Sequence, residues 1–339
     1  MKVHKVMNID TKTDNKQSSI PALSKLFESV VADLRTLGDV RIEGIVHKVL
    51  LDAQGAWLRP QLVFAVAEEK KTPSQQMLTI AAVAEMVHCA SLLHDDVVDE
   101  GFTRRGQPTA NAQYGNAAAI LCGDVLMSRS LEMLAQDYPE AISAAARTIQ
   151  ELAHSALLEQ DFRYRCHAQR KDWIGIAEKK TGSLLGFCLA GLHAPEHTSE
   201  CFQLGYTLGQ FFQLCDDLKD FQTTGTGKPA LQDLKNGNLN WVLLHAAEMN
   251  PLFRKGLQQL WREPRTTHDC VSFFESWELK ASLDAGYLSA KDLKTKFAFQ
   301  SKQLLTPASH DALQEWLSTV INKALHKSKK ASQIALQSA

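Results

Sequence analysis

The sequence lacks the cysteine patterns of disulfide-stabilised or zinc-binding proteins. Its seven cysteines stand singly, and no CxxC pair occurs: they are Cys89, Cys122, Cys166, Cys188, Cys201, Cys215 and Cys270. A free cysteine in an apolar helical segment usually acts as a small core residue. An odd number without a framework argues against structural disulfides and structural zinc. We therefore expect a reducing compartment.

Excess charge and long apolar runs are also missing. The chain has 37 Lys and Arg against 38 Asp and Glu, for a net charge of -1. It therefore has no general attraction to nucleic acid or to an anionic membrane. The N-terminal residues contain no apolar core of a signal peptide. The best apolar stretch, 79–93, is shorter than the ~20 residues of a membrane span. We expect a cytoplasmic protein with no stable membrane insertion.

Glycine and proline are scarce, with 18 and 10 residues among 339, which argues against many short strands and turns. Apolar residues instead recur at three and four positions, as in amphipathic helices. Helices are expected within 20–67, from 73 to beyond 95, and within 116–136, 139–167, 171–194, 199–221 and 239–325. Residues 100–115 and 222–238 are expected to be loops. The sequence predicts one all-α domain over 20–325, between a flexible tail at 1–19 and a basic tail at 326–339.

Two acidic motifs of the form DDxxD follow apolar helical segments. They are Asp95, Asp96 and Asp99 in the first, and Asp216, Asp217 and Asp220 in the second. Residues four apart lie on one face of a helix, so the first and last aspartates of each motif form a pair. Like charges at the negative end of a helix are destabilising by about 0.3–1 kcal/mol each. A cation should therefore offset them.

Magnesium suits these carboxylates, because it prefers oxygen ligands and is typically held by one or two carboxylates plus substrate phosphates. Two such clusters facing each other across a helical bundle would hold a Mg²⁺–diphosphate group. Basic residues lie near both motifs: Arg104 and Arg105 after the first, Lys228 after the second, and Lys180 between them. Guanidinium and ammonium groups suit phosphate oxygens. The alternative interpretation is two solvated acidic helix ends with ordinary basic surface residues.

With these motifs, the chain resembles the trans-isoprenyl diphosphate synthases over about residues 25–320. The resemblance rests on LLHDDVVDE followed by RRG, on Gly123-Asp124, on KTG from Lys180, on FFQLCDDLKD, and on GKP followed by Asp233-Leu234. The pattern is most similar to the bacterial medium- and long-chain polyprenyl diphosphate synthases. It implies an all-α bundle around a deep central cavity, a homodimer, and head-to-tail transfer of a prenyl group from an allylic diphosphate to isopentenyl diphosphate.

The resemblance also implies roles for individual residues. Mg²⁺, with three ions per site expected, would be bound by Asp95, Asp96, Asp99, Asp216, Asp217 and Asp220. The catalytic set would comprise Asp95, Asp96, Asp99, Lys180, Asp216 and Asp217. The allylic diphosphate would contact Arg104, Lys180, Thr181, Gln213 and Lys228. Isopentenyl diphosphate would contact Arg59, His88 and Arg105.

Product length can be argued from the helix before the first motif. One helical turn rises about 5.4 Å, comparable with one extended isoprene unit. Similar synthases with short products place bulky aromatic residues one turn before the motif, where this chain has the small Ala90 and Ser91. The next positions in the expected chain-length pocket are Met86, Val87, Met133 and Leu134. A product of C20 or longer is therefore expected, although small residues also suit ordinary close packing.

Three positions depart from the family pattern. Ala56 replaces the lysine expected to bind isopentenyl diphosphate, Leu231 replaces a glycine, and Asn238 replaces the lysine of a Gly-Lys pair. Losing one charged hydrogen bond to a phosphate costs about 1.5–3 kcal/mol. Two alternatives to a synthase therefore stay open. One is a class I terpene cyclase acting on an allylic diphosphate alone, and the other is a weakly active or regulatory subunit of a synthase.

Overall fold

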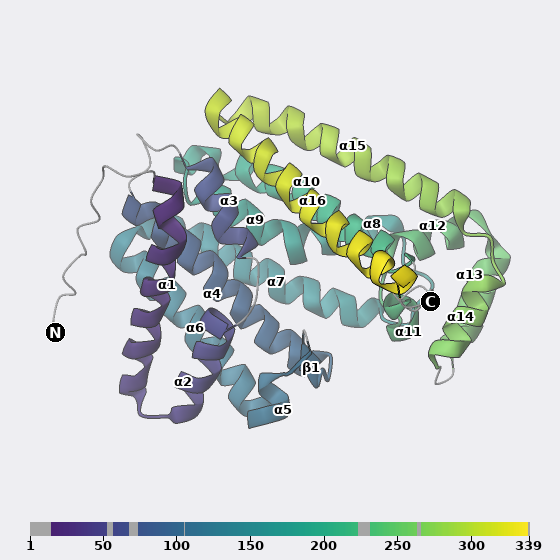
Figure 1. Cartoon of the computed structure of the whole chain (residues 1–339), viewed down its shortest axis with the longest axis horizontal. Helices are drawn as coiled ribbons and strands as arrows, with labels where there is room; N and C mark the ends of the chain where they lie inside the picture. The colour runs from purple at the N-terminus through teal and green to yellow at the C-terminus, as the bar shows by residue number, and fades with distance from the viewer. Residues whose placement is uncertain are drawn as a thin grey trace. The chain divides into compact units, whose positions relative to one another are not determined.

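A computed structural model of the protein describes residues 15–52, 57–67, 74–104, 106–222, 231–262 and 266–337 (Figure 1). Side chains are described from Ser19 to Asn322 within these ranges. The chain divides into two compact units, Met1–Pro139 and Glu140–Ala339. The described residues are almost entirely helical, which confirms the all-α prediction. The prediction of a single domain over 20–325 stays a prediction.

The first unit is built around one long buried helix, α4, which packs against α1, α3 and α6. Its elements are α1 (Asn15–Leu34), η1 (Arg35–Leu37), α2 (Val40–His47), η2 (Lys48–Asp52), α3 (Leu58–Val66), α4 (Ser74–Val98), β1 (Thr103–Arg104), β2 (Gln107–Pro108), α5 (Ala110–Tyr114) and α6 (Asn116–Asp137). α1 thus begins inside the predicted tail, most of which lies outside the described residues. By length and composition α4 could cross a membrane, but 72% of its most apolar window is buried, as in a core helix.

The loop predicted at 100–115 contains regular structure. β1 and β2 pair in antiparallel register, with Thr103 opposite Pro108 and Arg104 opposite Gln107. Gly106 lies in the turn between the strands, and its φ of +77° is a left-handed conformation, which glycine adopts without steric cost. The short helix α5 follows, and Thr109 caps it. Strands of two residues are too short to produce an alternating pattern, so the sequence does not reveal this hairpin.

The second unit is a bundle in which α10 packs against η4, α9 and α15. Its elements are η3 (Pro139–Ala141), which spans the boundary, α7 (Ile142–Phe162), α8 (Arg170–Ala177), η4 (Glu178–Gly182), α9 (Ser183–Ala190), η5 (Pro195–His197), α10 (Thr198–Lys219), α11 (Gln232–Asn236), α12 (Trp241–Met249), α13 (Pro251–Leu260), α14 (Thr267–Glu275), α15 (Lys280–Leu304) and α16 (Pro307–Gln337). α15 and α16 meet at their connecting turn and diverge from there in Figure 1. The backbone of α16 is helical into the predicted basic tail, whose side chains lie outside the described residues.

Glycines allow α10 to approach η4 and α9 backbone to backbone. A Cβ placed on Gly205 would lie 2.3 Å from the backbone nitrogen of Gly186, and one on Gly209 would lie 2.4 Å from the Cα of Gly182. No side chain fits at such distances, because real Cβ atoms do not come closer than about 3 Å to other heavy atoms. The KTG glycine, Gly182, therefore acts through close helix packing, and it holds Lys180 and Thr181 beside α10.

Gly205→Ala should lower the free energy of unfolding by about 2 kcal/mol or more, because the added methyl group meets backbone atoms that cannot rotate away. Gly175→Ala is the matched control, since a Cβ at this helical glycine of α8 meets nothing within 4 Å. It should leave stability unchanged or raise it by about 1 kcal/mol. Urea unfolding of both variants checks the pair. Equal stabilities would contradict the backbone contact.

Candidate functional site

The first aspartate motif lies where α4 ends. Asp95 and Asp96 occupy its last turn and Asp99 follows it, with the Asp99 amide donating to the Asp95 carbonyl at 2.8 Å. The Gly101 amide likewise donates to the Asp96 carbonyl at 2.8 Å. Asp96 is buried, at 8% exposure, whereas Asp95 is half-buried and Asp99 is exposed. The motif therefore leaves Asp99 exposed and Asp95 half-buried, and buries Asp96.

Arg104 forms an ion pair with Asp96, in which two guanidinium nitrogens converge on one carboxylate oxygen. Its Nη2 lies 2.7 Å and its Nε 2.9 Å from Oδ1 of Asp96, and Nε also lies 3.2 Å from Oδ2. Hydrogen bonds between two charged partners are shorter and stronger than neutral ones, and these bonds hold the guanidinium against the carboxylate. The residue predicted to contact the allylic diphosphate is thus brought beside a predicted metal ligand, in the same unit. Its neighbour Arg105 lies outside the described residues.

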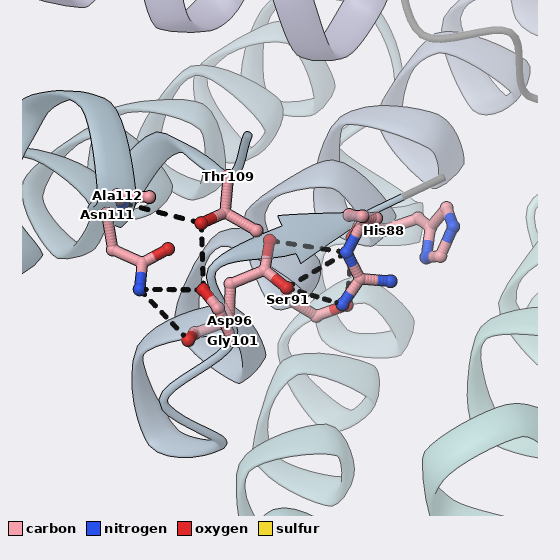
Figure 2. A network of polar contacts seen from close by, with 8 residues as sticks. His88, Ser91, Asp96, Gly101, Thr109, Asn111 and Ala112 are labelled. Atoms are coloured by element: carbon pink, nitrogen blue, oxygen red, sulfur yellow. Dashed lines mark hydrogen bonds and ion pairs between the residues drawn. The ribbon is translucent and has the colours of Figure 1, made fainter. Parts of the chain in front are cut away.

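Asn111 of α5 and Thr109, the N-cap of that helix, hold the hairpin to the end of α4 (Figure 2). Asn111 Nδ2 donates to the carbonyls of Asp96, at 3.2 Å, and Gly101, at 3.1 Å. Thr109 Oγ1 donates to the same Gly101 carbonyl at 2.8 Å and accepts from the Ala112 amide. The Asp96 carbonyl thus accepts from Asn111 as well as from the Gly101 amide, and the Gly101 carbonyl, just beyond α4, accepts from both Thr109 and Asn111. The sequence pattern does not predict either role, because both residues fall in the expected loop.

α4 carries a half-exposed stripe just before the motif. His88, Ser91 and Asp95 are half-buried, and their spacings of three and four residues place them on one face of the helix. Ser91 Oγ donates to the His88 carbonyl at 2.8 Å. Arg59 is also half-buried, in the first turn of α3, which packs against α4. The predicted isopentenyl diphosphate residues His88 and Arg59 thus lie on two elements in contact.

The remaining residues of the predicted chain-length pocket lie in the core of the first unit. Met86, Val87 and Ala90 of α4 and Met133 and Leu134 of α6 are all buried, and the two helices pack against each other. Only Ser91 lies on the half-exposed stripe. These burials fit both a chain-length function and ordinary close packing.

The Gly123-Asp124 pair acts on the histidine that precedes the motif. A Cβ on Gly123 would lie 2.3 Å from Nε2 of His94. The same ring nitrogen lies 3.1 Å from the Ile120 carbonyl and 3.5 Å from Asp124 Oδ1. Glycine at 123 therefore leaves the space that the His94 ring occupies against α6, and Asp124 supplies a carboxylate at its edge.

The aspartates of the second motif differ sharply in their surroundings. Asp216 is exposed and pairs with Lys219 at 2.7 Å, whereas Asp217 is only 1% exposed. Asp217 Oδ2 accepts from Trp173 Nε1 and from the Trp241 amide, each at 2.7 Å. Burial, followed by the nearby Asp233 carboxylate, raises the pKa of Asp217 well above its usual range, and these donors oppose the rise. Asp217 is thus a core carboxylate of the second unit.

Asp220 is held by the backbone that opens α11. Its Oδ1 accepts from the Gln232 amide at 2.7 Å, and its Oδ2 accepts from the Asp233 amide at 3.0 Å. Burial is the main cause that raises the pKa of Asp220 to about 6, and the charge of Asp233 adds to it. Asp233 in turn accepts from Asn238 Nδ2 at 3.2 Å and Asn240 Nδ2 at 2.8 Å. The sequence motif contains Asp233, but nothing in it predicts this role.

Two of the three departures from the family pattern have a structural account. Leu231 has φ +50° and its amide donates to the Asp220 carbonyl at 3.0 Å. It keeps the left-handed conformation that glycine adopts freely, at a cost of about 1–2 kcal/mol. Asn238 donates to Asp233 and accepts from Arg163 Nη2 at 3.4 Å. The third, Ala56, lies outside the described residues.

The predicted diphosphate contacts of the second unit lie on η4 and α10. Lys180 and Thr181 are half-buried in the π-helical turn η4, and Lys180 forms an ion pair with Glu159 of α7. Gln213 Nε2 donates to Asp217 Oδ1 at 3.0 Å. η4 packs against α10 through the glycine contacts described above. The remaining predicted contact, Lys228, lies outside the described residues.

The donor set fits an ion that takes much of its coordination from a ligand. Among the described residues, no group of three or more His, Cys, Asp or Glu side chains is arranged to hold a metal ion. Mg²⁺ usually keeps waters and binds through one or two carboxylates plus substrate phosphates. Asp95 and Asp99 in the first unit, and the exposed Asp216 in the second unit, each meet that requirement within their own unit. Asp217, which is buried and accepts from three protein donors, does not.

Comparisons with known proteins agree with this chemistry. Residues 42–275 match the family model described as Polyprenyl synthetase. Solanesyl diphosphate synthase 1, chloroplastic, of Arabidopsis thaliana is 30% identical over 288 residues, 78% of this chain and 70% of that protein. Heptaprenyl diphosphate synthase component 2 of Geobacillus stearothermophilus is 36% identical over 216 residues, 60% of this chain and 66% of that protein.

Solved structures show the same fold. The crystal structure of polyprenyl synthase from Caulobacter crescentus CB15, complexed with calcium and isoprenyl diphosphate, has a TM-score of 0.75 and 26% sequence identity. The match covers 91% of this chain and 97% of that chain.

Arg104→Met should shift two affinities in opposite directions. Without the guanidinium, Asp96 loses the cation that competes with a metal among the described residues, so Mn²⁺ alone should bind more tightly. Inorganic diphosphate with Mn²⁺ should bind at least about tenfold more weakly, because a charged hydrogen bond to phosphate contributes about 1.5–3 kcal/mol. Isothermal titration calorimetry measures both.

Arg35→Met is the matched control for this pair. It removes another ion-paired arginine of the same unit, whose partner Glu43 lies 2.7 Å away, and both affinities should stay at the wild-type values. A loss of Mn²⁺ affinity on Arg104→Met would contradict the competition between Arg104 and the metal.

Proposed function

Because the chain belongs to the polyprenyl synthetase family, we propose that it transfers prenyl groups head to tail. An allylic diphosphate is condensed with isopentenyl diphosphate, and the product is a polyprenyl diphosphate of C20 or longer. The relatives that support this length include solanesyl and nonaprenyl diphosphate synthases. The structural observation that carries the proposal is the end of α4, where the Asp96–Arg104 ion pair lies beside the accessible Asp95 and Asp99.

These residues suit the ionisation of an allylic diphosphate. The C–O bond breaks, its electron pair leaves with the diphosphate, and negative charge grows on the phosphate oxygens. Arg104 and Lys180 stabilise that charge, because cations aimed at developing charge act strongly in a site shielded from water. Divalent ions bound to the carboxylates would supply Lewis-acid stabilisation of the same leaving group.

Bond formation needs positioning more than proton transfer. The double bond of isopentenyl diphosphate attacks the allylic cation, and the released diphosphate can accept the proton that the adduct loses. His88 and Arg59, with Arg105, are proposed to hold the second diphosphate so that attack precedes capture by water. Ala56 lacks the charge of the lysine in the family pattern, so we expect weakened affinity for isopentenyl diphosphate rather than loss of the reaction.

We propose Mg²⁺ as the metal, with three ions per site and Asp95, Asp96, Asp99, Asp216 and Asp220 as its candidate protein ligands. Asp96 would have to exchange Arg104 for the ion. The solved relative with calcium and isoprenyl diphosphate supports a divalent cation. Oxygen-rich, incomplete protein coordination is typical of Mg²⁺ sites that share phosphate ligands.

A cytoplasmic homodimer is the proposed working form. A second candidate is a subunit of a hetero-oligomeric synthase, because a relative 36% identical is named component 2 of heptaprenyl diphosphate synthase. The terpene cyclase alternative is not favoured, since the curated relatives described above are diphosphate synthases.

Product analysis tests the proposed function. The purified protein is incubated with Mg²⁺, labelled isopentenyl diphosphate, and geranyl, farnesyl or geranylgeranyl diphosphate. Chains extended to C20 or beyond are expected, and Ala56→Lys should lower KM for isopentenyl diphosphate. Consumption of the allylic substrate without incorporation of label would instead indicate a cyclase, and complete inertness would indicate a subunit that needs a partner.

Ser91→Phe tests the chain-length argument. A phenyl ring on the half-exposed stripe of α4, one turn before Asp95, should block growth of the chain and shift the products toward shorter lengths. Ser91→Ala keeps the position small and should leave the product distribution unchanged. Thin-layer or mass-spectrometric analysis of dephosphorylated products reads the difference, and unchanged lengths in Ser91→Phe would contradict the assignment.

A further inference from the structure

Asp217 occupies a different environment from its two partners in the second motif. Asp216 is exposed and Asp220 is half-buried, whereas Asp217 lies in the core of the unit at 1% exposure. Consecutive helical residues point about 100° apart. When Asp216 points to solvent at the end of α10, the side chain of Asp217 therefore turns into the bundle.

The Asp217 carboxylate already accepts hydrogen bonds from three protein donors. Oδ2 receives the Trp173 indole N–H from α8 and the Trp241 amide from the start of α12, both at 2.7 Å. Oδ1 receives Gln213 Nε2 at 3.0 Å. A metal bound here would have to displace donors that are themselves buried, and an abandoned buried donor costs about 1–3 kcal/mol.

The same contacts connect Asp217 to Asp220. Asn240 Nδ2 donates to the Asp217 carbonyl at 3.3 Å and to Asp233 Oδ2 at 2.8 Å. Asn240 also caps α12, through its Oδ1 and the amides of Val242 and Leu243. Asp233 and its neighbour then orient the Asp220 carboxylate through their amides. The path from the Trp173 indole to the Asp220 carboxylate runs entirely through described hydrogen bonds and the short backbone segments between them.

We infer that Asp217 is a positioning residue and not a metal ligand. The hydrogen bond from Trp173 gives Asp217 this positioning role. Asp217 joins α8, α10 and α12 at one point, and this junction sets the direction of Asp220 and of the exposed Asp216. The second motif then supplies metal ligands from its first and last aspartates only. The inference deepens the proposed function and rests on it where metal binding is concerned.

Metal binding separates a ligand from a positioning residue. Mn²⁺ with inorganic diphosphate is titrated calorimetrically into wild type, Asp217→Asn and Asp216→Asn. Asparagine at 217 keeps an oxygen for the two N–H donors, and the Gln213 amide can turn to accept from the new NH₂ group. Asp217→Asn should therefore bind close to the wild-type affinity, whereas Asp216→Asn should lose at least about tenfold. Equal losses in both variants would overturn the inference.

Trp173→Phe tests the indole donor, with Trp316→Phe as the matched control. Both indoles are buried in the second unit, but Nε1 of Trp316 has no hydrogen-bond partner among the described residues. The two substitutions lose similar volume, and only Trp173→Phe removes a donor from Asp217. It should weaken binding of Mn²⁺ with diphosphate roughly tenfold, as loss of a group supporting a metal ligand does. Equal affinities of the two folded variants would overturn the positioning role.

A double-mutant cycle of Trp173→Phe and Asp217→Asn, followed by urea unfolding, measures the coupling free energy between the two residues without any metal. Coupling between the two sites is expected, and additive effects would overturn the inference. If the wild-type protein binds no Mn²⁺ with diphosphate, the proposed function fails. The cycle then decides alone whether Trp173 and Asp217 form the junction.

Discussion

Carboxylates placed at the carboxyl ends of helices are the constraint on which the rest of the site depends. The helix dipole makes such positions unfavourable for negative charge, so each carboxylate needs a compensating group, and the surrounding elements provide it. Arg104 reaches Asp96 from a hairpin, an indole and an amide reach Asp217, and two backbone amides reach Asp220. The hairpin, α8 and the start of α11 must therefore lie where their donors can reach the aspartates.

Much of the fold follows from local pattern, and the orientation of the site residues does not. The apolar periodicity predicts α6 and α10 almost to their ends, because a helix that buries one face has apolar residues at regular spacings of three and four. The two aspartate motifs are equally visible. Which aspartate turns inward depends on the hydrogen-bond donors that other elements place in the core. A single tryptophan in α8 gives no sign in the sequence that Trp173 donates to Asp217. The same holds for Thr109 and Asn111, whose bonds depend on the hairpin.

Several motif positions contribute space rather than chemistry. Gly123 leaves room for the His94 ring, and Gly182 allows α10 to approach η4. Leu231 is the converse case: a large buried side chain stands where the family pattern has glycine, and its backbone is left-handed. Its burial contributes about 1.5–3 kcal/mol, comparable with the conformational cost of about 1–2 kcal/mol. At this departure from the family pattern, the burial of the leucine side chain therefore offsets the cost of its left-handed backbone.

Two of the cations predicted to contact diphosphate already have anionic partners, Arg104 with Asp96 and Lys180 with Glu159. An anion that takes over either cation leaves a carboxylate behind without its counter-charge. Orthophosphate or a bare diphosphate offers nothing in return, whereas a diphosphate carrying divalent cations gives the released Asp96 a new partner. We expect the protein to discriminate between ligands by the charge they carry as well as by their shape. Abundant small phosphates without bound metal should therefore bind weakly.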